Sequence, residues 1–180
     1  MNSELVNNII KNYESDNPKT LDNLSKILNF GKLGGTGKLI IYPVDQGFEH
    51  GPDRSFSGNP EAYDPHYHIN FAIEAGMSAF AAPLGMIESG YSTFAEKIPY
   101  ILKCNSSNSL TNIKDQALTG NVQDAIRLGC TGVGFTIYPG SEFNHKLMEQ
   151  ACGLFREAKG AGLITVLWSY ARGDISKKGE

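Results

Sequence analysis

The chain has 180 residues, of which 41% are hydrophobic and 19% charged, a composition typical of a soluble globular domain with a sizeable core. Its net charge of −3 and its isoelectric point near 5.8 provide no basic surface for nucleic acid or for an acidic membrane leaflet. We therefore expect neither of these as a partner.

The cysteines and the N-terminus indicate the compartment. Cys104, Cys130 and Cys152 are odd in number, widely spaced and without a CxxC pair, so neither a disulfide framework nor a thiolate zinc site is indicated. The N-terminus has no basic region followed by an apolar core, and no apolar stretch reaches the roughly 20 residues that span a bilayer. We expect a cytoplasmic protein.

Residues 1–37 are predicted to form an N-terminal helical extension. Apolar residues recur there at helical spacing, and Asn17-Pro18 interrupts the pattern, so two short helices are expected. The glycine-rich "GGTGK" that follows resembles a phosphate-binding loop. However, position 32 is a lysine where that motif needs glycine, and a strand follows the loop instead of preceding it. We interpret it as a flexible turn leading into the first strand.

The remainder repeats one pattern: an amphipathic helix, a glycine, a short apolar strand, and a turn with polar residues. "HINFAIEAG" leads into "MSAFAAPLG", "VQDAIRLG" into "CTGVGFTIYPG", and "MEQACGLFREAKGAG" into "LITVLWSYARG", with a shorter copy from "STFAEK" into "IPYILKCN". Strands alternating with helices indicate parallel βα units. With the first strand, five strands are predicted, at residues 39–44, 78–82, 100–103, 131–137 and 163–169.

Two α/β architectures fit this alternation. A doubly wound sheet of five strands would be complete at this length, whereas a (β/α)₈ TIM barrel needs about 250 residues. Polar residues follow nearly every strand, and a barrel gathers such strand ends around one mouth. This favours residues 38–180 as a TIM barrel truncated to about five βα units. The residues at the strand ends are Asp45, Lys103, Asn105, Tyr138, Ser141, Trp168, Tyr170 and Arg172.

Asp45 ends the first strand, in "PVDQGFEHGP". A carboxylate there can bind substrate hydroxyls, orient a cation or transfer a proton, although it could also simply cap the next turn. Glu49 and His50 in the same turn are weaker candidates. His66 and His68 are two residues apart and cannot share one helical face, so they do not predict a metal pair.

Lys103 lies in the otherwise apolar strand "IPYILKCN". A desolvated lysine can form a Schiff base, or it can supply a fixed positive charge to a phosphate or carboxylate. The alternative is a lysine that extends from the strand end into solvent.

"WSYARG" brings three side chains that could act on a substrate to the end of the last strand. Tyr170 can donate or accept a proton, Arg172 can bind a phosphate with two hydrogen bonds, and Trp168 can exclude water. The alternative is an aromatic strand end packed against a loop.

Five blocks in the order "YPVDQGFEHGP", "AAPLG", "ILKCNSSNSL", "GFTIYPGS" and "VLWSYARG" resemble the archaeal-type class I fructose-bisphosphate aldolase family. The resemblance implies a TIM barrel that reversibly cleaves fructose 1,6-bisphosphate to dihydroxyacetone phosphate and glyceraldehyde 3-phosphate in glycolysis and gluconeogenesis. It also implies a Schiff-base lysine, no metal or other cofactor, and a homo-oligomer for the full-length protein.

The resemblance also implies roles for individual residues. Tyr170 matches the acid/base tyrosine of the family and Asp45 its acidic residue after the first strand. Ala171 stands where many relatives have proline. The family's Schiff-base lysine lies on the sixth strand, so none is expected in this chain, whose activity alone is expected to be absent. The residues expected to bind substrate are Trp168, Arg172, Lys103, Gln46 and His50.

Two other functions remain open. One is a related aldolase or transaldolase-type synthase that acts on another ketose phosphate. The other is an inactive truncated remnant, which folds only with a partner that supplies the remaining strands.

Overall fold

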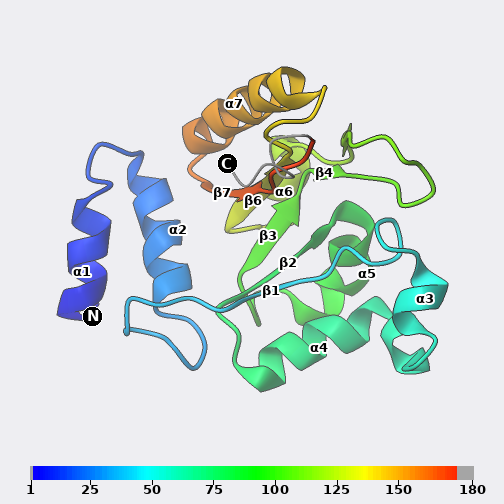
Figure 1. Cartoon of the computed structure of the whole chain (residues 1–180). Coiled ribbons are helices and arrows are strands. Elements are labelled where there is room, and N and C mark those ends of the chain that lie inside the picture. The colour runs from blue at the N-terminus through cyan, green and yellow to red at the C-terminus, as the bar shows by residue number, and fades with distance from the viewer. Residues whose placement is uncertain (1, 174–180) are drawn as a thin grey trace.

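A computed structural model describes residues 2–173 and contains a curled five-stranded sheet (Figure 1). The strand order is β1-β2-β3-β6-β7, and every neighbouring pair is parallel. In a doubly wound sheet the order of the strands reverses at a switch point. Here the strands of the sheet follow chain order from one edge to the other, as in the wall of a (β/α)₈ barrel. The strands are β1 Ile41–Pro43, β2 Ala79–Pro83, β3 Tyr100–Lys103, β6 Gly132–Ile137 and β7 Ile164–Ser169.

Two of the helices between the strands begin after residues whose side chains cap a helix N-terminus, and one of these helices ends at a glycine. Asp64 accepts a hydrogen bond from the His66 amide at 2.9 Å before α4, and Gly76 ends that helix at a φ of 70°. Asn121 and Asp124 form a capping box at the start of α6. The elements are α3 Pro52–Phe56, η1 Pro60–Tyr63, α4 Pro65–Ala75, α5 Leu84–Phe94, α6 Val122–Arg127 and α7 Asn144–Gly160.

The two faces of the sheet carry different side chains, because alternate strand residues point to opposite faces. Phe80, Leu102 and Phe135 are buried on the face that packs against the connecting helices. The opposite face, here called the inner face, mixes small residues such as Ala81 and Gly134 with the large Trp168. A Cβ at Gly134 would lie 1.9 Å from the Trp168 ring, so glycine on β6 gives this ring its place over the inner face.

The N-terminal extension forms the expected two helices, α1 Glu4–Lys11 and α2 Pro18–Leu28. Val6 and Ile27 are fully buried in a second apolar cluster with Ala79, Ile101 and Ile164 of the inner face. These three strand residues lie near the beginnings of their strands, so the helix pair covers the amino-terminal end of that face (Figure 1).

A small antiparallel pair, β4 Asn105–Ser106 and β5 Ala117–Leu118, was not predicted. Two-residue strands leave no hydrophobic period to detect. The Asn105 side chain accepts from the Thr136 amide and donates to the Thr136 carbonyl, both at 2.8 Å. Asn105 thereby ties this pair to β6. Among residues 2–173, no helix combines the length and apolar character needed to cross a bilayer.

Cys152 is expected to be the reactive thiol of the described residues. Burial raises the pKa of Cys104 and of Cys130 to about 12, whereas Cys152 is exposed. At pH 8 a pKa near 12 leaves about one thiol in 10⁴ as the nucleophilic thiolate. Titration with a chromogenic disulfide should count one fast thiol in the native chain and three after denaturation. Fast reaction at Cys104 or Cys130 would contradict this packing.

Candidate active site

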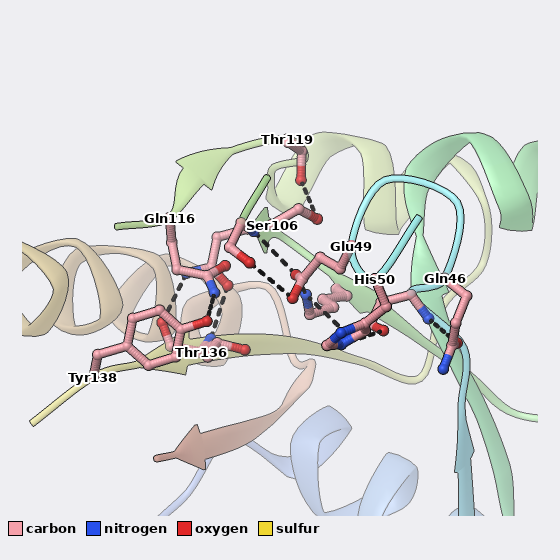
Figure 2. Close-up of polar contacts among 12 residues, drawn as sticks. Gln46, Glu49, His50, Ser106, Gln116, Thr119, Thr136 and Tyr138 are labelled. Carbon is pink, nitrogen blue, oxygen red and sulfur yellow. Dashed lines mark hydrogen bonds and ion pairs between the residues drawn. The ribbon is translucent and has the colours of Figure 1, made fainter. Parts of the chain in front are cut away.

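A pocket of about 330 Å³ lies at the carboxyl ends of the strands. Its walls come from the ends of β1, β3, β6 and β7 and from the loop after β1. Figure 2 shows Glu49 and His50 on that loop, facing the group formed by Gln116, Thr136 and Tyr138. The polar and aromatic lining residues are Asp45, Gln46, Glu49, His50, Lys103, Thr136, Tyr138, Trp168, Tyr170 and Arg172.

The loop after β1 folds back so that its acidic residues face this pocket. The Glu49 amide donates to the Asp45 carbonyl at 3.1 Å, and the Gly47 amide donates to the Glu49 carbonyl at 3.2 Å. Gly47 and Gly51 have φ values of 112° and 67°, which glycine adopts without steric cost. His50 has a φ of 63° although it carries a Cβ, so the loop holds local backbone strain beside the pocket.

Lys103 ends β3 inside a cluster of charges. Its ammonium pairs with the Glu49 carboxylate and lies 3.4 Å from Oδ2 of Asp45. Only 8% of the Lys103 side chain is exposed, so the alternative in which it extends into solvent is wrong. A buried ammonium needs such partners, because its desolvation is otherwise very costly.

Glu49 is the most completely bonded carboxylate of the pocket. Besides Lys103, it accepts from the Ser107 amide at 3.0 Å and from the Ser107 hydroxyl at 3.1 Å. The residue is 5% exposed. The sequence marked Glu49 only as a weak candidate, because nothing in "DQGFEHG" shows that the loop turns this side chain inward.

Asp45, Glu49 and His50 also have ligand atoms within 4.8 Å of one another, a spacing that a metal ion could use. The Lys103 ammonium pairs with both carboxylates of this group, so a metal ion would compete with it for the same oxygens. Nε2 of His50 lies 3.7 Å from Oδ1 of Asp45, and the Gln46 side chain accepts from the Asp45 amide at 3.2 Å. The absence of a metal stays a prediction.

The other side of the pocket is aromatic and cationic. The Arg172 guanidinium lies over two rings, 5.1 Å from the Tyr138 centroid and 5.5 Å from the Tyr170 centroid. The Gln116 amide donates to the Tyr138 hydroxyl at 2.7 Å. The Tyr170 amide donates to the Ile137 carbonyl at 3.1 Å, which extends the β6–β7 pairing beyond Ser169. Nearly half of Tyr170 is exposed, at 48%.

The structure brings together all seven residues that the sequence placed in the site: Asp45, Gln46, His50, Lys103, Trp168, Tyr170 and Arg172. Their chemical roles stay predictions. Sequence reasoning missed Thr136, and it named Tyr138 only as a strand-end residue. Both lie at the end of β6, so counting pocket residues at every strand end would have found them.

His66 and His68 lie outside this pocket and do not form a pair. His66 contacts the Asp64 carboxylate, and its backbone and ring hydrogen bonds lower the pKa of Asp64. The buried His68 bridges the Ala62 carbonyl at 2.9 Å and the Tyr42 hydroxyl at 3.3 Å. The two histidines therefore have separate partners, and the absence of a metal between them stays a prediction.

The sequence matches an aldolase family and proteins named as aldolases. The model of the DeoC/LacD family aldolase matches residues 39–180. A Chlamydia trachomatis protein named probable fructose-bisphosphate aldolase class 1 is 41% identical over 162 residues, covering 88% of this chain and 47% of that protein. A Methanocaldococcus jannaschii protein named fructose-bisphosphate aldolase/6-deoxy-5-ketofructose 1-phosphate synthase is 39% identical over 150 residues, covering 77% of this chain and 47% of that protein.

A solved structure is similar as well. It is described as an archaeal fructose-1,6-bisphosphate aldolase with the catalytic Lys covalently bound to the carbinolamine intermediate of the substrate. It matches with a TM-score of 0.73 and 36% identity over 82% of this chain and 57% of that one. These matches confirm the truncated barrel fold and the resemblance seen in the sequence.

The chain spans about half the length of the curated relatives it matches. The family match begins at residue 39, and the division into residues 1–37 and 38–180 stays a prediction. With a match across residues 39–180, the chain belongs to the DeoC/LacD aldolase family.

Proposed function

We propose that this chain is part of a cytoplasmic class I fructose-bisphosphate aldolase that cleaves fructose 1,6-bisphosphate to dihydroxyacetone phosphate and glyceraldehyde 3-phosphate. The observation that carries the proposal is the convergence of Asp45, Lys103, Trp168, Tyr170 and Arg172 on one pocket in a chain of an aldolase family. The names of the relatives support the same reaction.

The proton-transfer and binding steps of aldol cleavage have candidate residues in the pocket. The reaction breaks a carbon–carbon bond, removes a proton from the hydroxyl on one fragment and returns a proton to the carbon of the other. In this proposal Tyr170 exchanges a proton with the substrate, and Asp45 accepts a hydrogen bond from a substrate hydroxyl; both residues line the pocket. Arg172 offers a cation to a phosphate, and Trp168 forms an apolar wall of the pocket.

The nucleophile in this proposal is a lysine that is not among the 180 residues. Lys103 is the one lysine that lines the pocket among the described residues, and its ammonium is paired with Glu49. An ammonium has no lone pair with which to attack a carbonyl carbon. The Schiff-base lysine is expected on the strand after β7, which lies outside the described residues.

Borohydride reduction with dihydroxyacetone phosphate tests the assignment of the nucleophile. The protein expressed from its own gene is reduced in the presence of the ketone, and the modified lysine is located by peptide mass spectrometry. We expect no adduct on any lysine of residues 1–180. An adduct on Lys103 would make it the nucleophile and would overturn this part of the proposal. A parallel cleavage assay with fructose 1,6-bisphosphate reports on the reaction itself.

A related synthase is the second candidate. The Methanocaldococcus jannaschii relative carries a double name, aldolase and 6-deoxy-5-ketofructose 1-phosphate synthase, at 39% identity. A donor–acceptor screen that uses fructose 1,6-bisphosphate as donor and aldehydes as acceptors separates the two candidates. Glyceraldehyde 3-phosphate leaves in both reactions, so the fate of the dihydroxyacetone phosphate moiety separates them. Faster transfer of this moiety to an acceptor aldehyde than its release as free dihydroxyacetone phosphate would favour the synthase. The absence of both reactions would favour the inactive remnant.

The full-length protein is proposed to form a homo-oligomer. This part of the proposal rests on the family resemblance alone, and sedimentation velocity measures it directly.

A further inference from the structure

We infer that Glu49 is a positioning residue that holds Lys103 as an internal counter-ion beside Asp45. In this arrangement Lys103 neither attacks the substrate nor binds its phosphate; its charge orients the Asp45 carboxylate. The effect on catalysis rests on the proposed function, whereas the pairing itself does not.

The balance of charge is the first support. Two carboxylates, Asp45 and Glu49, face one ammonium, so this side of the pocket has an excess of negative charge. A phosphate brought to Lys103 would lie beside both carboxylates and be repelled by them. The Arg172 guanidinium lies over aromatic rings instead and pairs with neither of these carboxylates. The predicted role of Lys103 in substrate binding is therefore replaced by an internal one.

The fixed position of Glu49 is the second support. Its two oxygens accept from Lys103, from the Ser107 amide and from the Ser107 hydroxyl. A carboxylate that accepts three hydrogen bonds while 7% exposed has little freedom to rotate. Because one donor is a backbone amide, the position of the Glu49 carboxylate is set by the chain that follows β4.

The contrast between the two carboxylates is the third support. The Asp45 side chain is 26% exposed, compared with 7% for Glu49, and both contact Lys103. The order of contacts therefore runs from Ser107 through Glu49 and Lys103 to Asp45, which is more exposed in the pocket than Lys103 or Glu49. Only a group that is both held and accessible can meet a substrate hydroxyl in a fixed geometry.

Acetylation of lysines provides the test of the pairing. The protein expressed from its own gene is treated with trace acetic anhydride at several pH values, and each lysine is quantified by mass spectrometry. Lys146 is the internal reference, because it is ion-paired with Asp115 at 3.1 Å but 52% exposed. We expect Lys103 to react at least tenfold more slowly than Lys146, and Glu49→Gln to raise its rate at least tenfold. Glu88→Gln, which breaks an exposed pair with Arg127, should leave Lys103 protected.

An unchanged Lys103 rate in Glu49→Gln would overturn the inference, because burial alone would then explain the protection. If Glu49→Gln does not fold, Ser107→Ala replaces it: this change removes the hydroxyl donor and keeps both charges and the backbone amide. It should raise the Lys103 rate two- to fivefold, and no change there would contradict the proposed order of contacts.

Kinetics separates failure of this inference from failure of the proposed function. With fructose 1,6-bisphosphate, Glu49→Gln should lower kcat at least tenfold while KM changes less than threefold, and Glu49→Asp should recover part of kcat. If the wild type cleaves the substrate but Lys103 labelling does not respond to Glu49→Gln, the function stands and the inference is wrong. If labelling responds but the wild type has no aldolase activity, the pairing stands and the proposed function is wrong.

Discussion

Tyr170→Phe is expected to lower kcat for fructose 1,6-bisphosphate cleavage by roughly 100- to 10,000-fold, the range attributed to a positioned acid/base group. The phenyl ring keeps its place against Arg172, whose guanidinium lies 5.5 Å from the ring centroid, so only the hydroxyl is lost. Borohydride trapping with dihydroxyacetone phosphate should proceed as in the wild type. Steady-state kinetics and trapping, run on the same preparation, measure both quantities.

Tyr63→Phe is the matched control for this change. Tyr63 is 49% exposed, close to the 48% of Tyr170, and lies in η1 outside the pocket. It should keep kcat within twofold of the wild type. Full turnover by Tyr170→Phe would remove Tyr170 from its acid/base role. A loss of trapping together with turnover would mean that the hydroxyl takes part in forming the Schiff base as well.

Lys103→Met is expected to lower the free energy of unfolding by about 3–5 kcal/mol, because removal of one partner leaves the buried Glu49 charge unpaired. The flexible apolar side chain of methionine can fill much of the volume, so lost packing should be the smaller part of the effect. Urea titration followed by circular dichroism measures this free energy. The double variant Lys103→Met/Glu49→Gln should recover part of the loss, because it removes both charges.

Lys146→Met is the control for loss of an ammonium. Lys146 pairs with Asp115 at the surface, and an exposed pair contributes about 0–1 kcal/mol. Equal destabilisation by Lys103→Met and Lys146→Met would show that the pair beneath the pocket contributes no more than a surface pair. A double variant less stable than Lys103→Met would mean that the hydrogen bonds from Ser107 to Glu49 outweigh the unpaired charge.

Much of the fold was predictable because its signals are local and repeated. The strands predicted at 100–103, 131–137 and 163–169 differ from β3, β6 and β7 by at most one residue at an end. Continuous apolar runs and glycines at helix ends produced this agreement; β3 and β6 are buried throughout, whereas Leu167 on β7 is exposed. The first strand, Ile41–Pro43, is shorter than the predicted 39–44: Leu39 and Ile40, which precede it, are exposed, and the buried Val44 follows it.

The sequence predicted which residues line the pocket better than which hydrogen bonds and ion pairs they form. Parallel strands end at one edge of a barrel, so listing polar residues at strand ends was enough to bring Asp45, Lys103 and Tyr170 together. The role of Glu49 depends on how the loop after β1 turns, and therefore on the φ values at three loop positions. Its partner Ser107 follows a two-residue strand that leaves no pattern. Contacts set by irregular backbone require the structure.

His50 shows how stability and function can favour different residues at one position. Its φ of 63° is a conformation in which glycine would relieve steric cost, on the order of 1 kcal/mol. A method that redesigns the chain for heat resistance would therefore choose glycine at position 50. That choice would remove an imidazole 3.7 Å from the Asp45 carboxylate at the pocket wall. Efforts to make this protein more robust should leave the strained loop position untouched.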